Sequence, residues 1–186
     1  MKRRNFIKNA SLTGVGLTVG SAIIGCKEIP SEEKTPIIEN KESELTATLP
    51  IVIATWNVEN STAKAWEVLQ EGKSSLEAIE QGCMIEEANA EGQSVGLGGL
   101  PDRDGNVTLD ACIMNKEGDY GAVVCMQNII HPIAVARKVM EDTPHVILAG
   151  KGAEQFAVSL GFKRENLLTE ASKKAWEEWK KTSEYK

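Results

Sequence analysis

The stretch over residues 94–122 constrains the fold of this chain more than any other. It begins with small residues, which let a backbone take a positive φ or lie close against another segment, and then turns at a proline and at an Asp-Gly pair. Large apolar residues alternate with other types over 107–114, and an apolar run over 121–126 follows a polar turn. This pattern predicts a β-hairpin. Because both faces of its first arm carry apolar or small groups, we expect burial on both sides.

The other elements are predicted from apolar runs and amphipathic patterns. Residues 49–55 and 145–149 are continuous apolar runs, typical of buried strands. Ser74 and Glu77 have the spacing of a capping box and predict the start of a helix, with Cys83 on its inner face and Glu87 in water. Further helices are expected over 61–70, with Ser61 as its cap, over 133–141, over 153–160, closed by Gly161, and over 170–181.

The first 25 residues have the pattern of an export signal. Arg3 and Arg4 lie in a basic start, and a short apolar segment follows that falls below the roughly 20 apolar residues needed to span a bilayer. The paired arginines resemble a twin-arginine signal, and Ile23 to Cys26 resembles a lipobox, in which the cysteine is diacylated. We expect export to the cell envelope or periplasm and a lipid anchor on Cys26. An uncleaved anchor, or a cysteine that follows a signal by chance, is the alternative.

Residues 26–48 form a charged, proline-containing stretch that we expect to be a disordered tether, and residues 49–186 form the globular part. The formal net charge is −6, and several of the positive charges lie in the signal, so the remainder is more acidic still. An acidic body without a basic stripe argues against nucleic acid as a partner.

Apart from Cys26, the chain has three cysteines: Cys83, Cys112 and Cys125. An odd number leaves at least one thiol free. Cys112 and Cys125 fall on the two arms of the predicted hairpin, and we interpret all three as small core residues rather than as a disulfide pair. No spacing indicates a metal site, and the loop over 96–99 lacks the Lys-Ser/Thr of a phosphate-binding loop. We expect neither a metal nor a cofactor.

Motifs spread over the globular part resemble one family. GGLPDRDGNVTLDACIM followed by GAVVCM, with TWN at 55–57 and HPIAVARKVMEDTPHVILAGKGAEQFA from His131 onward, closely resembles the α-subunit region of glycosylasparaginase (aspartylglucosaminidase), an N-terminal-nucleophile hydrolase. The resemblance covers about residues 49–186. It implies the N-terminal half of an αββα four-layer sandwich, whereas the sequence pattern alone predicts only the α/β class around one core.

The resemblance also implies a chemistry. Family members hydrolyse the amide between asparagine and N-acetylglucosamine with a threonine whose own α-amino group acts as base, after the precursor cuts itself at an Asp-Thr bond. The only Asp-Thr pair here, Asp142-Thr143, matches a non-catalytic part of the family pattern. We therefore expect the chain to be inactive alone, and to need a β-subunit bearing the threonine in an (αβ)2 assembly.

Two residues match positions of the family site. Trp56 matches a tryptophan that lines the substrate pocket, although alone it could be a core aromatic at a strand end. Ser94 matches a serine beside the amine of the nucleophile, which a neutral hydrogen-bond partner can orient without protonating, although alone it is a loop serine. We interpret Asp110 as a structural carboxylate rather than a catalytic acid, and His131 and His145 as structural.

Two other functions compete with glycosylasparagine hydrolysis. An isoaspartyl peptidase or L-asparaginase is disfavoured, because those enzymes usually begin the first strand with a GGAG-type loop where this chain has TWN. The other is a non-catalytic, lipid-anchored envelope protein derived from such a half.

Overall fold

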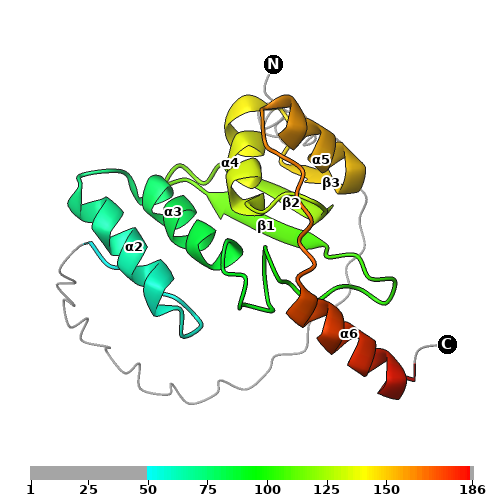
Figure 1. Ribbon diagram of the computed structural model, residues 1–186. Helices are drawn as coiled ribbons and strands as arrows, with labels where there is room; N and C mark the ends of the chain where they lie inside the picture. The colour runs from blue at the N-terminus through cyan, green and yellow to red at the C-terminus, as the bar shows by residue number, and fades with distance from the viewer. Residues whose placement is uncertain (1–49, 185–186) are drawn as a thin grey trace, which may run out of the picture. The chain divides into compact units, whose positions relative to one another are not determined.

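The structure, a computed structural model, describes residues 50–184, so the predictions for Arg3, Arg4, Cys26 and the tether lie outside the described residues. The described part is of the α/β class, with five helices and a three-stranded sheet (Figure 1). Its elements are α2 (Glu59–Gln70), α3 (Ser75–Glu87), β1 (Leu109–Met114), β2 (Tyr120–Met126), α4 (Pro132–Asp142), β3 (Ile147–Ala149), α5 (Gly150–Ser159) and α6 (Glu170–Thr182).

The predicted hairpin is confirmed. β1 and β2 are antiparallel, with Met114 opposite Tyr120, and β3 joins β2 in parallel, so the strand order is β1-β2-β3. The turn is held by the Asn115 side chain, whose Oδ1 accepts the N–H groups of Glu117 at 3.0 Å and Asp119 at 2.8 Å. Such an Asx-type turn fixes the hairpin register locally.

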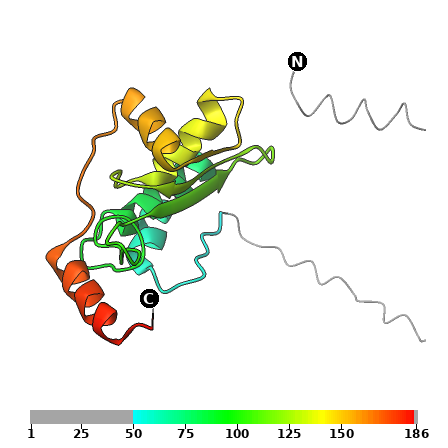
Figure 2. The same ribbon diagram turned by 90° about the vertical axis from the view of Figure 1, so that its right-hand side faces the viewer.

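One face of the sheet packs under α4 and α5, as Figures 1 and 2 both show. This covered face consists of Ala111, Ile113, Gly121 and Val123, and Val123 is fully buried. Gly121 is required there: a Cβ on this residue would lie 2.2 Å from the Ala136 carbonyl oxygen. The helix therefore sits closer to the strand than any side chain at 121 would allow.

The opposite face, which we call the open face, carries Ala122, which is buried, and four exposed residues: Cys112, Met114, Tyr120 and Ile147. Met114 is 61% exposed. The prediction that these strands are buried on both faces is therefore wrong for the described residues. α4 and α5 cover one face only, while α3 borders the other at the start of β1 and leaves these four side chains exposed.

The predicted strand over 49–55 is also wrong. Residues 50–54 have no regular secondary structure, and Ile53 is 84% exposed. A strand forms only against a partner ladder, and no described strand pairs with this segment. The apolar β-branched residues of this segment suit a strand, but no strand among the described residues pairs with it.

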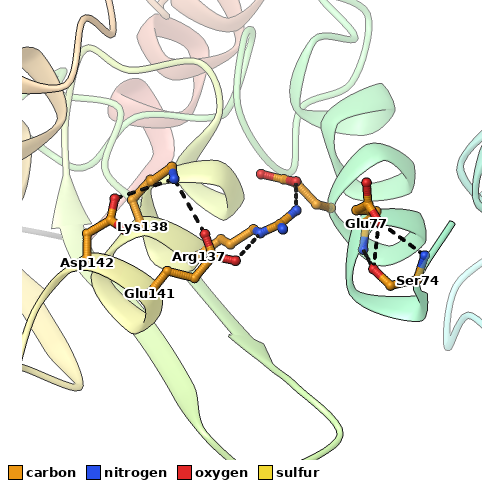
Figure 3. Close-up of polar contacts among 7 residues, drawn as sticks. Ser74, Glu77, Arg137, Lys138, Glu141 and Asp142 are labelled. Atoms are coloured by element: carbon orange, nitrogen blue, oxygen red, sulfur yellow. Dashed lines mark hydrogen bonds and ion pairs between the residues drawn. The ribbon is translucent and has the colours of Figure 1, made fainter.

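α3 begins with the predicted capping box: the Ser74 hydroxyl accepts the Glu77 N–H at 3.2 Å, and the Glu77 carboxylate accepts the Ser74 N–H at 3.1 Å. Figure 3 shows this box beside a second polar cluster on α4, where the Arg137 guanidinium contacts the Glu141 carboxylate at 2.7 Å. Arg137 also reaches α3 through Glu80 at 2.6 Å. These charged contacts join α3 to α4.

Two predictions about helix starts need correction, those for α2 and α5. α2 begins at Glu59 after Val58, without a side-chain cap, so Ser61 lies within the first turn instead of capping it. The helix predicted over 153–160 begins earlier, at Gly150. Its predicted closure by Gly161 is confirmed, because Gly161 follows the C-cap with φ +93 and donates its N–H to the Val158 carbonyl at 3.0 Å. Boundary shifts of one or two residues are common because helix ends lack intrahelical partners.

α6 packs against the loop that precedes β1. Ser172, fully buried, donates its hydroxyl to the Gly98 carbonyl, and the Trp176 indole N–H donates to the Arg103 carbonyl at 3.2 Å. The Lys180 ammonium lies 3.2 Å from the centroid of the Trp176 ring, a cation–π contact. α6 therefore holds the part of this loop that contains Gly98 and Arg103.

Candidate functional site

A large cavity of about 800 Å³ opens between α2, α3, the start of β1 and the segment 52–58. Its wall is mostly apolar. The few polar residues on it include Thr62 and Thr108. Ligand sites in proteins usually have this size and character. The cavity is therefore the candidate functional site.

Trp56 lies on this wall and is 76% exposed. It belongs to the segment after residues 50–54, and its carbonyl accepts the Val58 N–H at 2.9 Å, which shapes the turn into α2. A large exposed aromatic ring beside a cavity can supply contact area to a bound molecule. Trp56 does not pack in the core, so the core-aromatic alternative does not describe this chain.

Ser94 lies on the wall of the same cavity and is exposed. It belongs to the loop over residues 88–100, which we call the Ser94 loop. Gly96 in this loop has φ +61, and a Cβ there would lie 1.9 Å from the Glu87 carbonyl oxygen. The expectation that small residues here serve a positive φ and a close approach is confirmed.

The structure thus brings Trp56 and Ser94, far apart in sequence, to one cavity. Ser61 joins them from α2: its hydroxyl is buried and has no hydrogen-bond partner among the described residues. Sequence reasoning gave Ser61 only a capping role, because an unpaired hydroxyl cannot be read from a helical pattern.

Asp110 has a structural contact, as expected, although it is exposed rather than buried. Its carboxylate accepts the Cys125 N–H at 2.6 Å, next to the register shift between Leu109 and Ala111. Cys125 has φ +52, which a bulge allows and the carboxylate stabilises. The Asp110 side chain therefore holds the irregular end of the hairpin.

Glu87 was expected in water and is instead 5% exposed. Its Oε1 accepts the Ile133 N–H at 3.0 Å, and its Oε2 lies 3.2 Å from Nδ1 of His131. Burial raises the pKa of this carboxyl, and the bonds from His131 and Ile133 oppose that shift only in part. The structural interpretation of His131 fits this contact, whereas His145 is exposed and lies outside the cavity wall.

The sequence carried a signal for Glu87 that the helical pattern analysis missed. α3 packs between two helices: Ala78 and Gly82 face α2, while Glu80 pairs with Arg137 of α4. Glu87 lies seven residues after Glu80, two helical turns along the same side. A helical pattern with one apolar face predicts that the other side of α3 is exposed, although this side contacts α4 through Glu80 and Glu87.

Cys83, Cys112 and Cys125 are all free, and all three are exposed, so the interpretation as core residues is wrong. The hairpin register places Cys112 opposite Ala122 rather than Cys125. Cys83 and Cys112 both line the cavity. Although Cys83 is partly accessible, desolvation of its thiol and then the negative charge of Glu87 raise the pKa of this thiol.

Within residues 50–184, no group of three or more His, Cys, Asp or Glu side chains is placed to hold a metal ion. A search of the same residues finds no helix that combines the length and apolar character needed to cross a bilayer.

Comparison with known proteins finds one family and several relatives that share a name. The profile of a family described as Asparaginase matches residues 38–186. A protein of Elizabethkingia miricola named N(4)-(Beta-N-acetylglucosaminyl)-L-asparaginase is 46% identical over 185 residues, which cover 99% of this chain and 51% of that protein. Proteins of the same name are 46% identical in Rattus norvegicus and 43% identical in Mus musculus, over 70% of this chain and 38% of each relative.

The chain therefore spans about half the length of the curated relatives it matches, or less. The agreement runs through the residues that form the cavity, because the profile match includes Trp56, Ser94 and the hairpin. The chain belongs to the asparaginase family.

Proposed function

We propose that this chain is the α-subunit part of a glycosylasparaginase, which hydrolyses the amide bond between asparagine and N-acetylglucosamine. The printed names of the relatives support this activity. The observation that supports it most within the chain is that Trp56 and Ser94 line one cavity of about 800 Å³.

Each residue has a definite role in this proposal. The Trp56 ring forms a wall against the substrate. The Ser94 hydroxyl accepts a hydrogen bond from the α-amino group of a threonine at the start of the β-subunit and orients it as the base. The threonine hydroxyl then attacks the amide carbon, the C–N bond to the sugar amine breaks, and water releases aspartate from the acyl-enzyme.

The chain alone is inactive in this proposal, because the nucleophile belongs to the other half. The open face of the sheet supports the idea that a second half packs here, since Met114, Tyr120 and Ile147 are apolar and exposed. The complete enzyme is then a four-layer sandwich, assembled as (αβ)2.

The test is the full-length protein, extended through its second half. It is expected to cut itself into two chains, seen by mass spectrometry, and to release aspartate from glycosylasparagine. Trp56→Ala is expected to raise KM at least tenfold, and Ser94→Ala to lower kcat with KM nearly unchanged. Trp66→Ala is the matched control, because Trp66 lies on α2 outside the cavity wall. Hydrolysis of glycosylasparagine by the purified segment 50–186 would contradict the division of the site.

Export by the twin-arginine route and a lipid anchor on Cys26 are part of the same proposal. Buried acyl chains contribute about 0.8 kcal/mol per methylene, and a diacylated cysteine supplies the two chains that stable anchoring needs. Labelling cells with a fatty acid is expected to mark the wild-type protein and not Cys26→Ser. Equal labelling of both would remove the lipid anchor from the proposal, and loss of export in Arg3→Lys with Arg4→Lys would support the signal.

A further inference from the structure

The Ser94 loop leaves α3 at Glu87 and returns to the same residue. The Leu97 N–H donates to the Glu87 carbonyl oxygen at 2.7 Å, and Gly96 lies so close that no side chain fits there. The loop around Ser94 is therefore closed at both ends on one peptide group. A movement of that peptide is therefore expected to displace the turn that contains Ser94.

The Glu87 side chain fixes this peptide against the body of the protein. α4 has no cap from its own N-cap residue, His131. Glu87 supplies the missing acceptor from α3, through its bond to the Ile133 N–H at 3.0 Å. A carboxylate at a helix N-terminus is also favoured by the helix dipole. Since α4 packs on the covered face of the sheet, the carboxylate joins the loop to the core.

The loop also has contacts on both sides of Ser94: before it, the Gln93 carbonyl accepts the Leu100 N–H at 3.2 Å. The Gly98 N–H donates to the Leu167 carbonyl at 2.8 Å, and its carbonyl accepts the Ser172 hydroxyl. These bonds hold the C-terminal end of the loop. The bond from the Leu97 N–H to the Glu87 carbonyl is the one that ties the turn containing Ser94 to the end of α3.

We infer that Glu87 is a positioning residue, whose carboxylate bridges α3 and the N-terminus of α4 and so holds Ser94 in place on the cavity wall. The consequence for turnover rests on the proposed function, in which Ser94 orients the base. The consequence for the loop itself depends only on this chain.

The experiment compares two substitutions in the full-length protein. Glu87→Ala removes the bridge and leaves the Ile133 N–H without its acceptor, whereas Glu87→Gln keeps the shape and an oxygen acceptor. We expect Glu87→Ala to lower kcat about tenfold or more with KM changed less than threefold, because a small displacement of a positioning group reduces the rate strongly. Glu87→Gln is expected to restore kcat to within about threefold of wild type.

Glu80→Ala is the matched control for a general loss of stability. Glu80 also joins α3 to α4, through Arg137 at 2.6 Å, and Arg137 keeps its bond to Glu141 when Glu80 is removed. We expect this variant to lower the Tm and leave kcat unchanged. Equal losses of kcat in Glu80→Ala and Glu87→Ala, or no rescue by Glu87→Gln, would overturn the inference.

Hydrogen exchange separates this inference from the proposed function. Amide exchange at Leu97 is expected to speed up at least tenfold in Glu87→Ala and to stay unchanged in Glu80→Ala, whether or not the wild-type protein hydrolyses glycosylasparagine. An inactive wild type would refute the function, and the exchange result would still decide the role of Glu87. Unchanged exchange at Leu97 in Glu87→Ala would refute that role.

Discussion

The covered face and the open face of the sheet are built from the same strands, but they have different neighbours. On the covered face, Ile113 and Val123 are buried beneath α4 and α5, and on the open face Met114 and Tyr120 are exposed. Both faces carry apolar side chains. The apolar pattern of a strand therefore indicates that a face can be buried, while burial itself depends on the element that covers it.

The largest effect is expected on the covered face at Gly121. Gly121→Ala places a methyl group against the Ala136 carbonyl, where no flexible side chain can yield, and is expected to destabilise the full-length protein by about 3 kcal/mol or more. Urea denaturation measures this loss. Gly152→Ala in α5 is the control, because a Cβ there meets nothing within 4 Å, and equal loss in both variants would remove the close approach as the cause.

A pair of truncations compares the two faces directly. Val123→Ala, on the covered face, is expected to cost about 2 kcal/mol, as deletion of buried methyl groups generally does. Met114→Ala, on the open face, is expected to cost a similar amount in the full-length protein, because the second half covers it. A cost within about 0.5 kcal/mol of zero at Met114, typical of surface positions, would mean that the open face stays in water.

Ser74→Ala provides a baseline far from both faces. It removes the hydroxyl of the capping box and is expected to cost about 1 kcal/mol. The urea midpoint is the measurement, and Ser75→Ala, one residue later in the first turn, is the control. A loss at Ser74 as large as that at Val123 would show that local capping, rather than packing under α4, dominates stability.

The smallest effect is a pH dependence. The raised pKa of the Glu87 carboxyl means that the folded protein binds its proton more tightly than the unfolded chain, whose ordinary value is 4.5. The stability from this group is therefore present below pH 4.5 and lost as pH rises through the folded pKa. Because Glu87→Gln does not titrate, its stability relative to wild type is expected to increase over that range. The facing groups His131, Glu80 and Cys83 are the same in both proteins. A constant difference across pH would contradict the raised pKa.

Local signals in the sequence predicted most of the elements correctly. The hairpin, the capping box at Ser74, the Pro132 start of α4 and the final helix depend on residues adjacent in sequence, and all are confirmed. The strand prediction for residues 49–55 was wrong because a strand needs a pairing partner, and local sequence does not show whether one is present. The prediction that the cysteines are core residues was wrong for the same reason as the prediction of burial on the open face. In both cases burial depends on an element that covers the residues.

The candidate site also contains residues that the sequence predicted and one that it did not. Trp56 and Ser94 entered through a family resemblance and lie on one cavity, although their chemical roles stay predictions. Glu87 was missed because its burial arises from contacts with His131 and Ile133, more than forty residues away. The spacing from Glu80 marks the side of α3 that faces α4, but the bond to the Ile133 N–H depends on a contact that local sequence does not give.

The accessibility of Cys112 tests most directly whether a second half completes this fold. The Cys112 thiol lies on the open face and on the cavity wall, and it is exposed in the described part of the chain. Its alkylation rate can be followed by peptide mass spectrometry in the folded full-length protein, with the urea-unfolded protein as reference. Packing of the second half against the open face predicts at least tenfold slower alkylation in the folded protein. Alkylation at the unfolded rate would contradict it.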